Sequence, residues 1–259
     1  MDGFDPLQSF GPETAAHYDD SLRGDEDETV AFLADLAGSR PALELAIGTG
    51  RIALPLAARG VEVDGIEQSE AMIGRLREKP GGSDLRVVHG DMVVDAGPGG
   101  PYGLVFLVFN TIGNILTQEG QVACFENAAR QLLPDGVFVV EMELPWVSVP
   151  LTQFVNAEYV GADAVVLDVN RYDPSTQILC ENHVRIGPDG IRMGPISQRL
   201  AAPAELDLMA RIAGLRLVDR FGGWQREPFT ADSRRHVSVY GRCTCQSSGA
   251  RPPRSRPRA

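Results

Sequence analysis

The sequence predicts an α/β fold in which a mostly parallel β-sheet carries helices on both faces. Between residues 42 and 143, short apolar strands alternate with segments of helical periodicity, an order typical of parallel strands joined by crossover helices. The last two strands of this run are apolar and rich in β-branched residues, as strands buried on both faces are. Longer alternating stretches, separated by turn residues, follow between residues 154 and 200 and predict an antiparallel insertion.

The elements of the parallel part follow one another in a regular order. Residues 26–37 have apolar side chains at helical spacing and acids in the first turn, where they interact favourably with the helix dipole. Ser69 suits a helix N-cap, and Gly60 suits a helix end. We predict strands at residues 42–47, 61–66, 85–89, 102–109 and 137–143, and helices at residues 26–37, 51–60, 69–79 and 118–133.

The C-terminal part begins with the antiparallel insertion. Its strands are predicted at residues 154–160, 164–172, 177–186 and 190–200, followed by a helix at 203–214 and a closing antiparallel pair at 215–221 and 236–242. We predict one domain over residues 1–245, in which residues 146–200 form an antiparallel cap, and a disordered basic tail over residues 246–259.

The composition limits the class of protein. Of the 259 residues, 43% are hydrophobic and 23% are charged, as in ordinary globular proteins, and the formal net charge is −11. So acidic a chain repels phosphate backbones, and we expect no nucleic-acid partner. No segment reaches the roughly 18–20 apolar residues of a membrane span, and no basic region precedes an apolar stretch at the N-terminus. We expect a cytoplasmic protein with no membrane partner.

The cysteines and histidines do not predict a metal site. The four cysteines, at positions 124, 180, 243 and 245, have no histidine or cysteine partners at metal-ligand spacing. His183 and His236 lie in alternating strands, where a packed or surface histidine is the ordinary interpretation. We therefore expect no bound metal.

A glycine turn joins the first predicted strand to the next helix. Gly48 and Gly50 let the backbone turn tightly and approach a ligand closely. Together with Ala53 they also match the GxGxxA pattern of a dinucleotide site, so the turn alone does not decide the ligand. Glu67 follows at the end of the second strand, where a carboxylate can accept hydrogen bonds from both ribose hydroxyls of an adenosine.

Two further acids distinguish between the candidate nucleotides. Glu44 lies in the first strand beside the glycine turn, where a carboxylate opposes a pyrophosphate but favours the ammonium and sulfonium groups of S-adenosylmethionine. Asp91 follows the third strand, where it can accept a hydrogen bond from an adenine amino group while Met92 packs on the ring. Three acids at successive strands therefore predict a cationic nucleoside as cofactor.

These motifs resemble those of the class I S-adenosylmethionine-dependent methyltransferases, in particular the bacterial small-molecule group. ELAIGTG, GIEQSEAM, HGDM and LLPDGVFVVE occur in the order of that family, and the resemblance covers about residues 14–242. It implies a Rossmann-like sheet of seven strands with the last strand antiparallel, and S-adenosylmethionine lying across the strand ends. It also implies that the cap covers the substrate and can form homodimers.

The resemblance assigns cofactor-binding residues by position. In the family these positions hold the methionine end, the ribose, the adenine, the border of the methyl group and a lid over the cofactor. In that order they correspond to Glu44, Ala46 and Gly48; to Glu67 and Gln68; to Asp91 and Met92; to Phe109; and to Tyr18. Gly50 and Met72 are also expected to border the cofactor.

The chemistry requires little from the protein beyond positioning. A sulfonium is already activated, so the enzyme mainly holds a nucleophile in line with the methyl group in a dry pocket. No catalytic residue stands out, although Asn110 could orient an incoming hydroxyl or amine, and Glu143 could act as a base or bind an amine. The sequence leaves the methylated atom open between oxygen, nitrogen and carbon.

We predict an S-adenosylmethionine-dependent methyltransferase that acts on a small-molecule acceptor. Two alternatives stay open on the residues alone. GxGxxA followed by Glu67 also fits an NAD(P)-dependent oxidoreductase, and the lack of an obvious base also fits a protein that binds S-adenosylmethionine without turnover.

Overall fold

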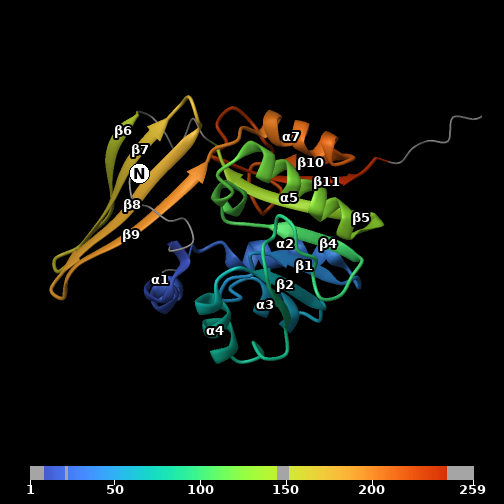
Figure 1. The fold of residues 1–259 in the computed structure, drawn as a ribbon, viewed down its shortest axis with the longest axis horizontal. Coiled ribbons are helices and arrows are strands. Elements are labelled where there is room, and N and C mark those ends of the chain that lie inside the picture. Colours follow the sequence, from blue (N-terminus) through green and yellow to red (C-terminus); the bar gives the residue numbers. More distant parts are fainter. Residues whose placement is uncertain (1–8, 21–22, 145–151, 244–259) are drawn as a thin grey trace, which may run out of the picture.

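The structure is a computed structural model that describes residues 9–20, 23–144 and 152–243 (Figure 1). Two short helices, α1 (Pro12–His17) and the 3-10 helix η2 (Tyr18–Asp20), precede the sheet. The longer helices and a second 3-10 helix are α2 (Glu26–Ala37), α3 (Ala53–Ala58), α4 (Glu70–Glu78), η3 (Thr111–Asn114), α5 (Gln118–Gln131) and α7 (Pro203–Ile212). None of the helices among these residues is long and apolar enough to cross a membrane.

A seven-stranded sheet forms the body of the protein, in the order β3-β2-β1-β4-β5-β11-β10. Its strands are β1 (Ala42–Leu45), β2 (Val63–Glu67), β3 (Arg86–His89), β4 (Tyr102–Leu107), β5 (Leu132–Glu143), β10 (Leu215–Phe221) and β11 (Arg235–Arg242). The first five strands pair in parallel, whereas β11 is antiparallel to both of its neighbours. The predicted Rossmann-like sheet, with its last strand antiparallel, is confirmed.

Helices cover both faces of this sheet because its central strands are apolar on both sides. Leu43 and Val105 pack with α5 and α7 in one hydrophobic core, whereas Ala42 and Leu104 pack with α2 and α3 in the other. Every residue of β1, β2 and β4 is buried. The carboxyl ends of the parallel strands therefore lie at one edge of a rigid sheet, which is where ligands bind in open α/β folds.

The predicted antiparallel cap is confirmed as a separate four-stranded meander beside the large sheet (Figure 1). It consists of β6 (Gln153–Val160), β7 (Val165–Asp173), β8 (Ile178–Gly187) and β9 (Gly190–Arg199), each antiparallel to the next. Arg199, at the end of β9, is buried and donates hydrogen bonds to Gln121 of α5 at 2.6 Å and to Glu205 of α7 at 2.6 Å. These contacts attach the base of the cap to the body.

Several boundaries differ from the prediction for identifiable reasons. The first and fourth strands end earlier than predicted, because Ala46 and Phe109 have left-handed φ angles of 56° and 65° that extended backbone does not allow. The fifth strand begins at Leu132 and not at residue 137, and its added residues lie at an irregularity of its register with β4. Residues 145–151 and the predicted basic tail from residue 246 lie outside the described residues, so the domain boundaries stay a prediction.

Candidate functional site

A cavity of about 920 Å³ lies where the parallel strands end, between the large sheet, the N-terminal helices and the cap. The loops after β1, β2 and β4 form one end of it, and the inner face of the cap forms the other. The cavity brings together six of the residues that the sequence assigned to the cofactor, namely Tyr18, Ala46, Gly48, Glu67, Met72 and Phe109, and both weak catalytic candidates, Asn110 and Glu143.

The glycine loop after β1 is fixed to the end of β2. The backbone N–H of Gly48 donates to Glu67 Oε2 at 2.8 Å, and the N–H of Ser69 donates to Glu67 Oε1 at 2.8 Å. Burial raises the pKa of Glu67, while these two hydrogen bonds act in the opposite direction. Each carboxylate oxygen keeps a second lone pair, so Glu67 holds the loop and can still accept from a ligand.

Left-handed backbone at three positions shapes this loop. Gly48 and Gly50 have φ angles of 57° and 77°, and Ala46 adopts 56° although it has a side chain. A Cβ at Gly50 would lie 2.4 Å from Leu76 Cδ1 of α4, whereas a Cβ at Gly48 would meet no atom within 4 Å. Gly50 therefore permits close packing of the loop on α4, and Gly48 leaves open space toward the cavity.

Glu44 is a buried carboxyl below the same loop. Its side chain is 4% exposed, and Oε2 has no hydrogen-bond partner within the described parts of the chain. Burial raises its pKa to about 8, which the charge of Arg51 partly opposes. The carboxyl borders a small second cavity of about 30 Å³, together with Tyr18 and Gly48. The Ala53 backbone also hydrogen-bonds this carboxyl, so Oε2 alone stays open, and a ligand cation beside it would favour the ionised form.

The N-terminal segment closes over the loop, as a lid residue at Tyr18 requires. Asp19 accepts a hydrogen bond from Thr49 Oγ1 at 2.7 Å and forms an ion pair with Lys79 at 2.7 Å. Ser69 Oγ donates to the backbone carbonyl of Phe10 at 2.6 Å. Tyr18 borders both cavities, and burial raises the pKa of its hydroxyl. The segment that bears Tyr18 is thus attached to the glycine loop and to the residues after β2, and the role of Tyr18 as a lid stays a prediction.

The loop after β4 is held by a buried acid that the sequence did not single out. Phe109 and Asn110 both have left-handed φ angles, of 65° and 58°. The fully buried Glu141 accepts a hydrogen bond from the Phe109 backbone N–H, and the guanidinium of Arg23 lies 3.6 Å from the centre of the Phe109 ring. Strain of this kind persists only where the surroundings fix it, and it is common at functional sites.

The two weak catalytic candidates lie together at this loop. Asn110 Oδ1 accepts a hydrogen bond from the backbone N–H of Glu143 at 2.6 Å, which joins the end of β5 to the loop after β4. The amide group of Asn110 and the carboxylate of Glu143 both border the cavity. Whether either contacts an acceptor stays a prediction.

Gln68, Asp91 and Met92 do not line the cavity. The Gln68 carbonyl contacts His89 Nε2 at 3.0 Å, Asp91 Oδ1 accepts from the Val93 N–H at 2.8 Å, and Met92 packs against the hydrophobic core. Their roles at ribose and adenine stay predictions.

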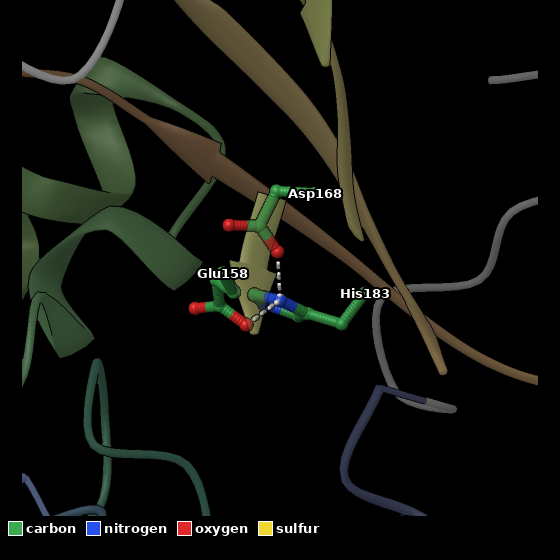
Figure 2. Close-up of side chains that lie close together, drawn as sticks. All are labelled: Glu158, Asp168 and His183. Atoms are coloured by element: carbon green, nitrogen blue, oxygen red, sulfur yellow. Dashed lines mark hydrogen bonds and ion pairs between the residues drawn. The ribbon is translucent and has the colours of Figure 1, made fainter. Parts of the chain in front are cut away.

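The inner face of the cap carries a group of ionisable side chains that sequence reasoning missed. His183 of β8 lies between Asp168 of β7 and Glu158 of β6, with Nδ1 at 2.6 Å from Asp168 Oδ1 and 3.7 Å from Glu158 Oε2 (Figure 2). Glu181 Oε2 lies 4.0 Å from His183 Nε2. We call these four residues the cap cluster. The hydrogen bond to Asp168 raises the pKa of His183 to about 9, so the cluster holds one cation among three carboxylates.

The cap cluster has more acceptors than donors. Burial raises the pKa of Glu181 and of Glu158, and the charge of Glu143 adds to the effect on Glu181. Asn170, which pairs with Glu181 across the strands, is 5% exposed and lines the cavity, and its Oδ1 has no hydrogen-bond partner among the described residues. The acidic end of the cavity therefore extends from Glu143 across the cap.

Three residues of the cap cluster also lie close enough together to be compared with the ligands of a metal site. Ligand atoms of Glu158, Asp168 and His183 lie within 4.8 Å of one another. The hydrogen bond to Asp168 uses the same Nδ1 that a metal would need, so we interpret the group as an ion-pair network. The sequence contains a pattern that could have indicated the cap cluster, because polar residues occupy alternate positions of β6, β7 and β8. His236, in contrast, is fully buried beside Ser238 Oγ at 2.8 Å and is a packed histidine.

Comparisons with known proteins agree with this geometry. Residues 42–136 match a family model described as a methyltransferase domain. The structure of the CcbJ methyltransferase from Streptomyces caelestis is similar with a TM-score of 0.87 and 38% identity, covering 92% of this chain and 99% of that one.

Two curated relatives are also similar. The cypemycin N-terminal methyltransferase of a Streptomyces species is 28% identical over 78% of this chain and 83% of its own length. The dTDP-3-amino-3,6-dideoxy-alpha-D-glucopyranose N,N-dimethyltransferase of Streptomyces fradiae is 32% identical over 54% of this chain and 56% of its own length.

Proposed function

The chain belongs to the class I S-adenosylmethionine-dependent methyltransferases, and we propose that it methylates an amine nitrogen of a small-molecule acceptor bound under the cap. The observation that carries this proposal is the acidic end of the cavity. Glu143 and three carboxylates of the cap cluster border the same space, together with the unpartnered oxygen of Asn170. A protonated amine supplies a positive charge to balance these carboxylates and a hydrogen-bond donor for Asn170 Oδ1.

The relatives support nitrogen over oxygen. Two of them are named for methylation at nitrogen, one at a peptide N-terminus and one at an amino sugar. Their named acceptors share an amine and differ in the rest of the molecule. A shared amine is the chemistry that an acidic cavity lining recognises.

The residues at the sheet edge fit S-adenosylmethionine. The unpartnered oxygen of Glu44 suits a cationic group, and the open space above Gly48 lets a ligand approach the backbone closely. Glu67 keeps acceptor capacity for ribose hydroxyls, and Tyr18 and Phe109 border the route from the loop to the cap. When bound, the cofactor supplies an activated methyl group on a sulfonium.

The residues of this chain then hold the acceptor and exclude water. An amine attacks only as the neutral base, so the ammonium must first give up a proton, and we assign the Glu143 carboxylate at the cavity to accept it. Glu143 lies at the cavity and close enough to Glu181 for its charge to raise the pKa of that carboxyl. We assign Glu143 and the cap cluster to binding the ammonium, and Asn110 to orienting the amine. Positioning of this kind can supply roughly 7–11 kcal/mol of the barrier.

The test uses pairs of acceptors that differ only in an amine or a hydroxyl, such as an amino sugar and its parent sugar. With S-adenosylmethionine present, we expect the amine member to gain one methyl group by mass spectrometry, with release of S-adenosylhomocysteine. Glu181→Gln should lower kcat/KM for that amine, while Glu119→Gln, on an exposed position of α5, should not. Methylation of the hydroxyl member alone would overturn the proposal.

The alternatives left open by the residues predict other results. An oxidoreductase would be stabilised against heat by NAD more than by S-adenosylhomocysteine, and we expect the reverse. A binding protein without turnover would release no S-adenosylhomocysteine with any amine. The family match and the unpartnered oxygen of Glu44 both support a methyltransferase over these alternatives.

The outer face of the cap supports a homodimer as a second part of the proposal. The inner face is polar, whereas the opposite face presents exposed apolar side chains, including Val155 (59% exposed), Val169 (42%) and Ile191 (66%). Exposed apolar side chains gathered on one face of a sheet are typical of an interaction site. We expect a dimer by light scattering, which Val169→Glu dissociates and Val94→Glu, at an exposed site away from the cap, does not. A monomer at all concentrations would contradict it.

The compartment that we propose is the cytoplasm. Cys124, Cys180 and Cys243 are free thiols, and thiols stay reduced in that compartment. Cell fractionation tests this point.

A further inference from the structure

Two arginines lie directly opposite each other on the inner face of the cap. Arg185 of β8 pairs with Arg192 of β9, close to the turn that joins these strands. On β8, Arg185 lies two positions from His183, and on β9, Arg192 lies two positions from Gly194, which is opposite His183. Both arginines are therefore on the face of the cap cluster, and both border the same cavity. The hairpin of β8 and β9 extends away from the large sheet (Figure 1), and the arginine pair lies near its turn.

No carboxylate of the described residues neutralises this pair. Arg192 Nη1 contacts His17 Nε2 of α1 at 3.0 Å, and His17 Nδ1 is already bonded to Asp20, so the histidine accepts from the arginine as a neutral ring. Neither arginine forms an ion pair within the described ranges, although the chain as a whole carries a net charge of −11. Like charges directly opposite each other destabilise an antiparallel pair.

The arginine pair is also separate from the acidic end of the cavity. On β8, Arg185 lies two positions beyond His183 and four beyond Glu181, and Arg192 of β9 is opposite Arg185. The inner face of the cap is therefore divided into an acidic part near the base and a basic part near the tip. Along one strand, two to four residues separate these parts, a distance of roughly 7–13 Å.

We propose that Arg185 and Arg192 bind an anionic group, a phosphate or a carboxylate, on the same acceptor whose amine lies at the cap cluster. Guanidinium groups suit both anions because they donate paired, parallel hydrogen bonds. An anion between the two arginines also removes their mutual repulsion. The proposal rests on the proposed function, and it defines the acceptor as amphoteric.

The separation limits which acceptors fit. The strand positions of the two parts lie roughly 7–13 Å apart along the backbone, so we expect an acceptor that carries its amine and its anion on different parts of a larger molecule. Contact between Arg192 and His17 places α1 beside the anion, so the same helix that precedes the lid borders the acceptor.

The test measures anion binding without any methyl transfer. The full-length protein, saturated with S-adenosylhomocysteine so that the glycine loop is occupied, is titrated by calorimetry with inorganic pyrophosphate, phosphate and acetate. The variants are Arg185→Gln, Arg192→Gln and the double variant. Arg171→Gln is the matched control, because Arg171 is an exposed residue on the outer face of the same cap sheet. Unchanged affinity for S-adenosylhomocysteine shows that each variant is folded.

We expect at least one of the anions to bind, and each single variant to weaken binding by about tenfold, as loss of a charge-assisted hydrogen bond does. Binding should weaken as salt rises. Tighter binding of pyrophosphate or phosphate than of acetate identifies a phosphorylated acceptor, and the reverse identifies a carboxylate.

The contrary results are equally distinct. No binding of any of the three anions at millimolar concentration would overturn the proposal. So would binding that the double variant leaves unchanged, or that Arg171→Gln weakens equally. Failure of the amine test leaves this titration unaffected, so the two proposals can fail separately.

Discussion

The two ends of the cavity differ in how their polar groups are satisfied. At the sheet edge, both oxygens of Glu67 are bonded to backbone N–H groups at 2.8 Å, and Asp19 attaches the lid to the loop. At the cap, Glu181 has a single ion pair at 4.0 Å among the described residues, and Asn170 Oδ1 has no partner. The cofactor end is thus formed by the protein itself, whereas the acceptor end retains charges and acceptors for a ligand.

The difference has a structural origin. The cofactor end lies on buried parallel strands, whose backbone is fixed by two hydrophobic cores. The acceptor end lies on a meander that contacts the body mainly at its base, through residues such as Arg199. Sheet edges therefore supply a constant site for one cofactor, and the cap can carry side chains suited to a particular acceptor.

The largest expected effect is on the affinity for S-adenosylhomocysteine, which should depend on the cofactor end of the cavity and not on the cap. Glu67→Gln should weaken binding of S-adenosylhomocysteine by about a hundredfold, because hydrogen bonds to a charged acceptor are lost in the loop and at the ligand. Glu181→Gln should leave that affinity unchanged. Calorimetry measures both, and an equal loss in the two variants would remove the distinction.

A glycine comparison tests the rigidity of the cofactor end. Gly50→Ala should lower the free energy of unfolding by about 2–3 kcal/mol, since its Cβ meets Leu76 and its φ is left-handed. Gly190→Ala, in the turn of the cap, has a left-handed φ of 110° but no atom within 4 Å, and should cost less. Urea unfolding compares the two variants, and a larger loss at Gly190 would contradict the packing argument.

The exception at the cofactor end, Glu44, has a distinct pH dependence. Its folded pKa is about 8, above the ordinary value of 4.5, so the stability that its protonated form contributes is complete below pH 4.5 and is lost as pH rises through about 8. The stability of Glu44→Gln relative to the native chain should therefore rise by about 2 kcal/mol between about pH 6 and about pH 8. Unfolding curves at the two pH values measure it, and a constant difference would contradict it.

The smallest effect lies in the cap cluster. Asp168→Asn should lower the pKa of His183 from about 9 by about one unit, because it removes the charged acceptor at 2.6 Å. Glu158→Gln, at 3.7 Å, should lower it less. The raised pKa of His183 contributes stability fully below pH 6.5, and this is lost as pH rises through about 9. An NMR titration measures the pKa of His183 in the native chain and in both variants. An unchanged pKa in Asp168→Asn would contradict the ion pair.

The sequence carried more information about the cofactor end than about the cap. Continuous apolar strands and a glycine turn are local patterns, so the parallel sheet and the positions of Glu44 and Glu67 could be predicted. The six-residue helix α1 is too short for a periodic signal. The early end of β1 depends on the left-handed φ of Ala46, which no local pattern marks.

The cap cluster and the arginine pair depend on strand register. Asp168 meets His183, and Arg185 meets Arg192, only because three strands pair with a defined offset. Alternation shows which residues share a face of one strand, and it does not show which residues of neighbouring strands are opposite. Glu141 was missed for a related reason, since its partner Phe109 is 32 positions away.

A crystal structure with S-adenosylhomocysteine tests the central claim most directly. Ribose hydroxyls within hydrogen-bond distance of Glu67, with the sulfur directed into the cavity toward Glu143 and the cap cluster, are the predicted result. A nucleoside seated elsewhere, or a sulfur directed away from the cap, would contradict the arrangement of cofactor and acceptor in one cavity.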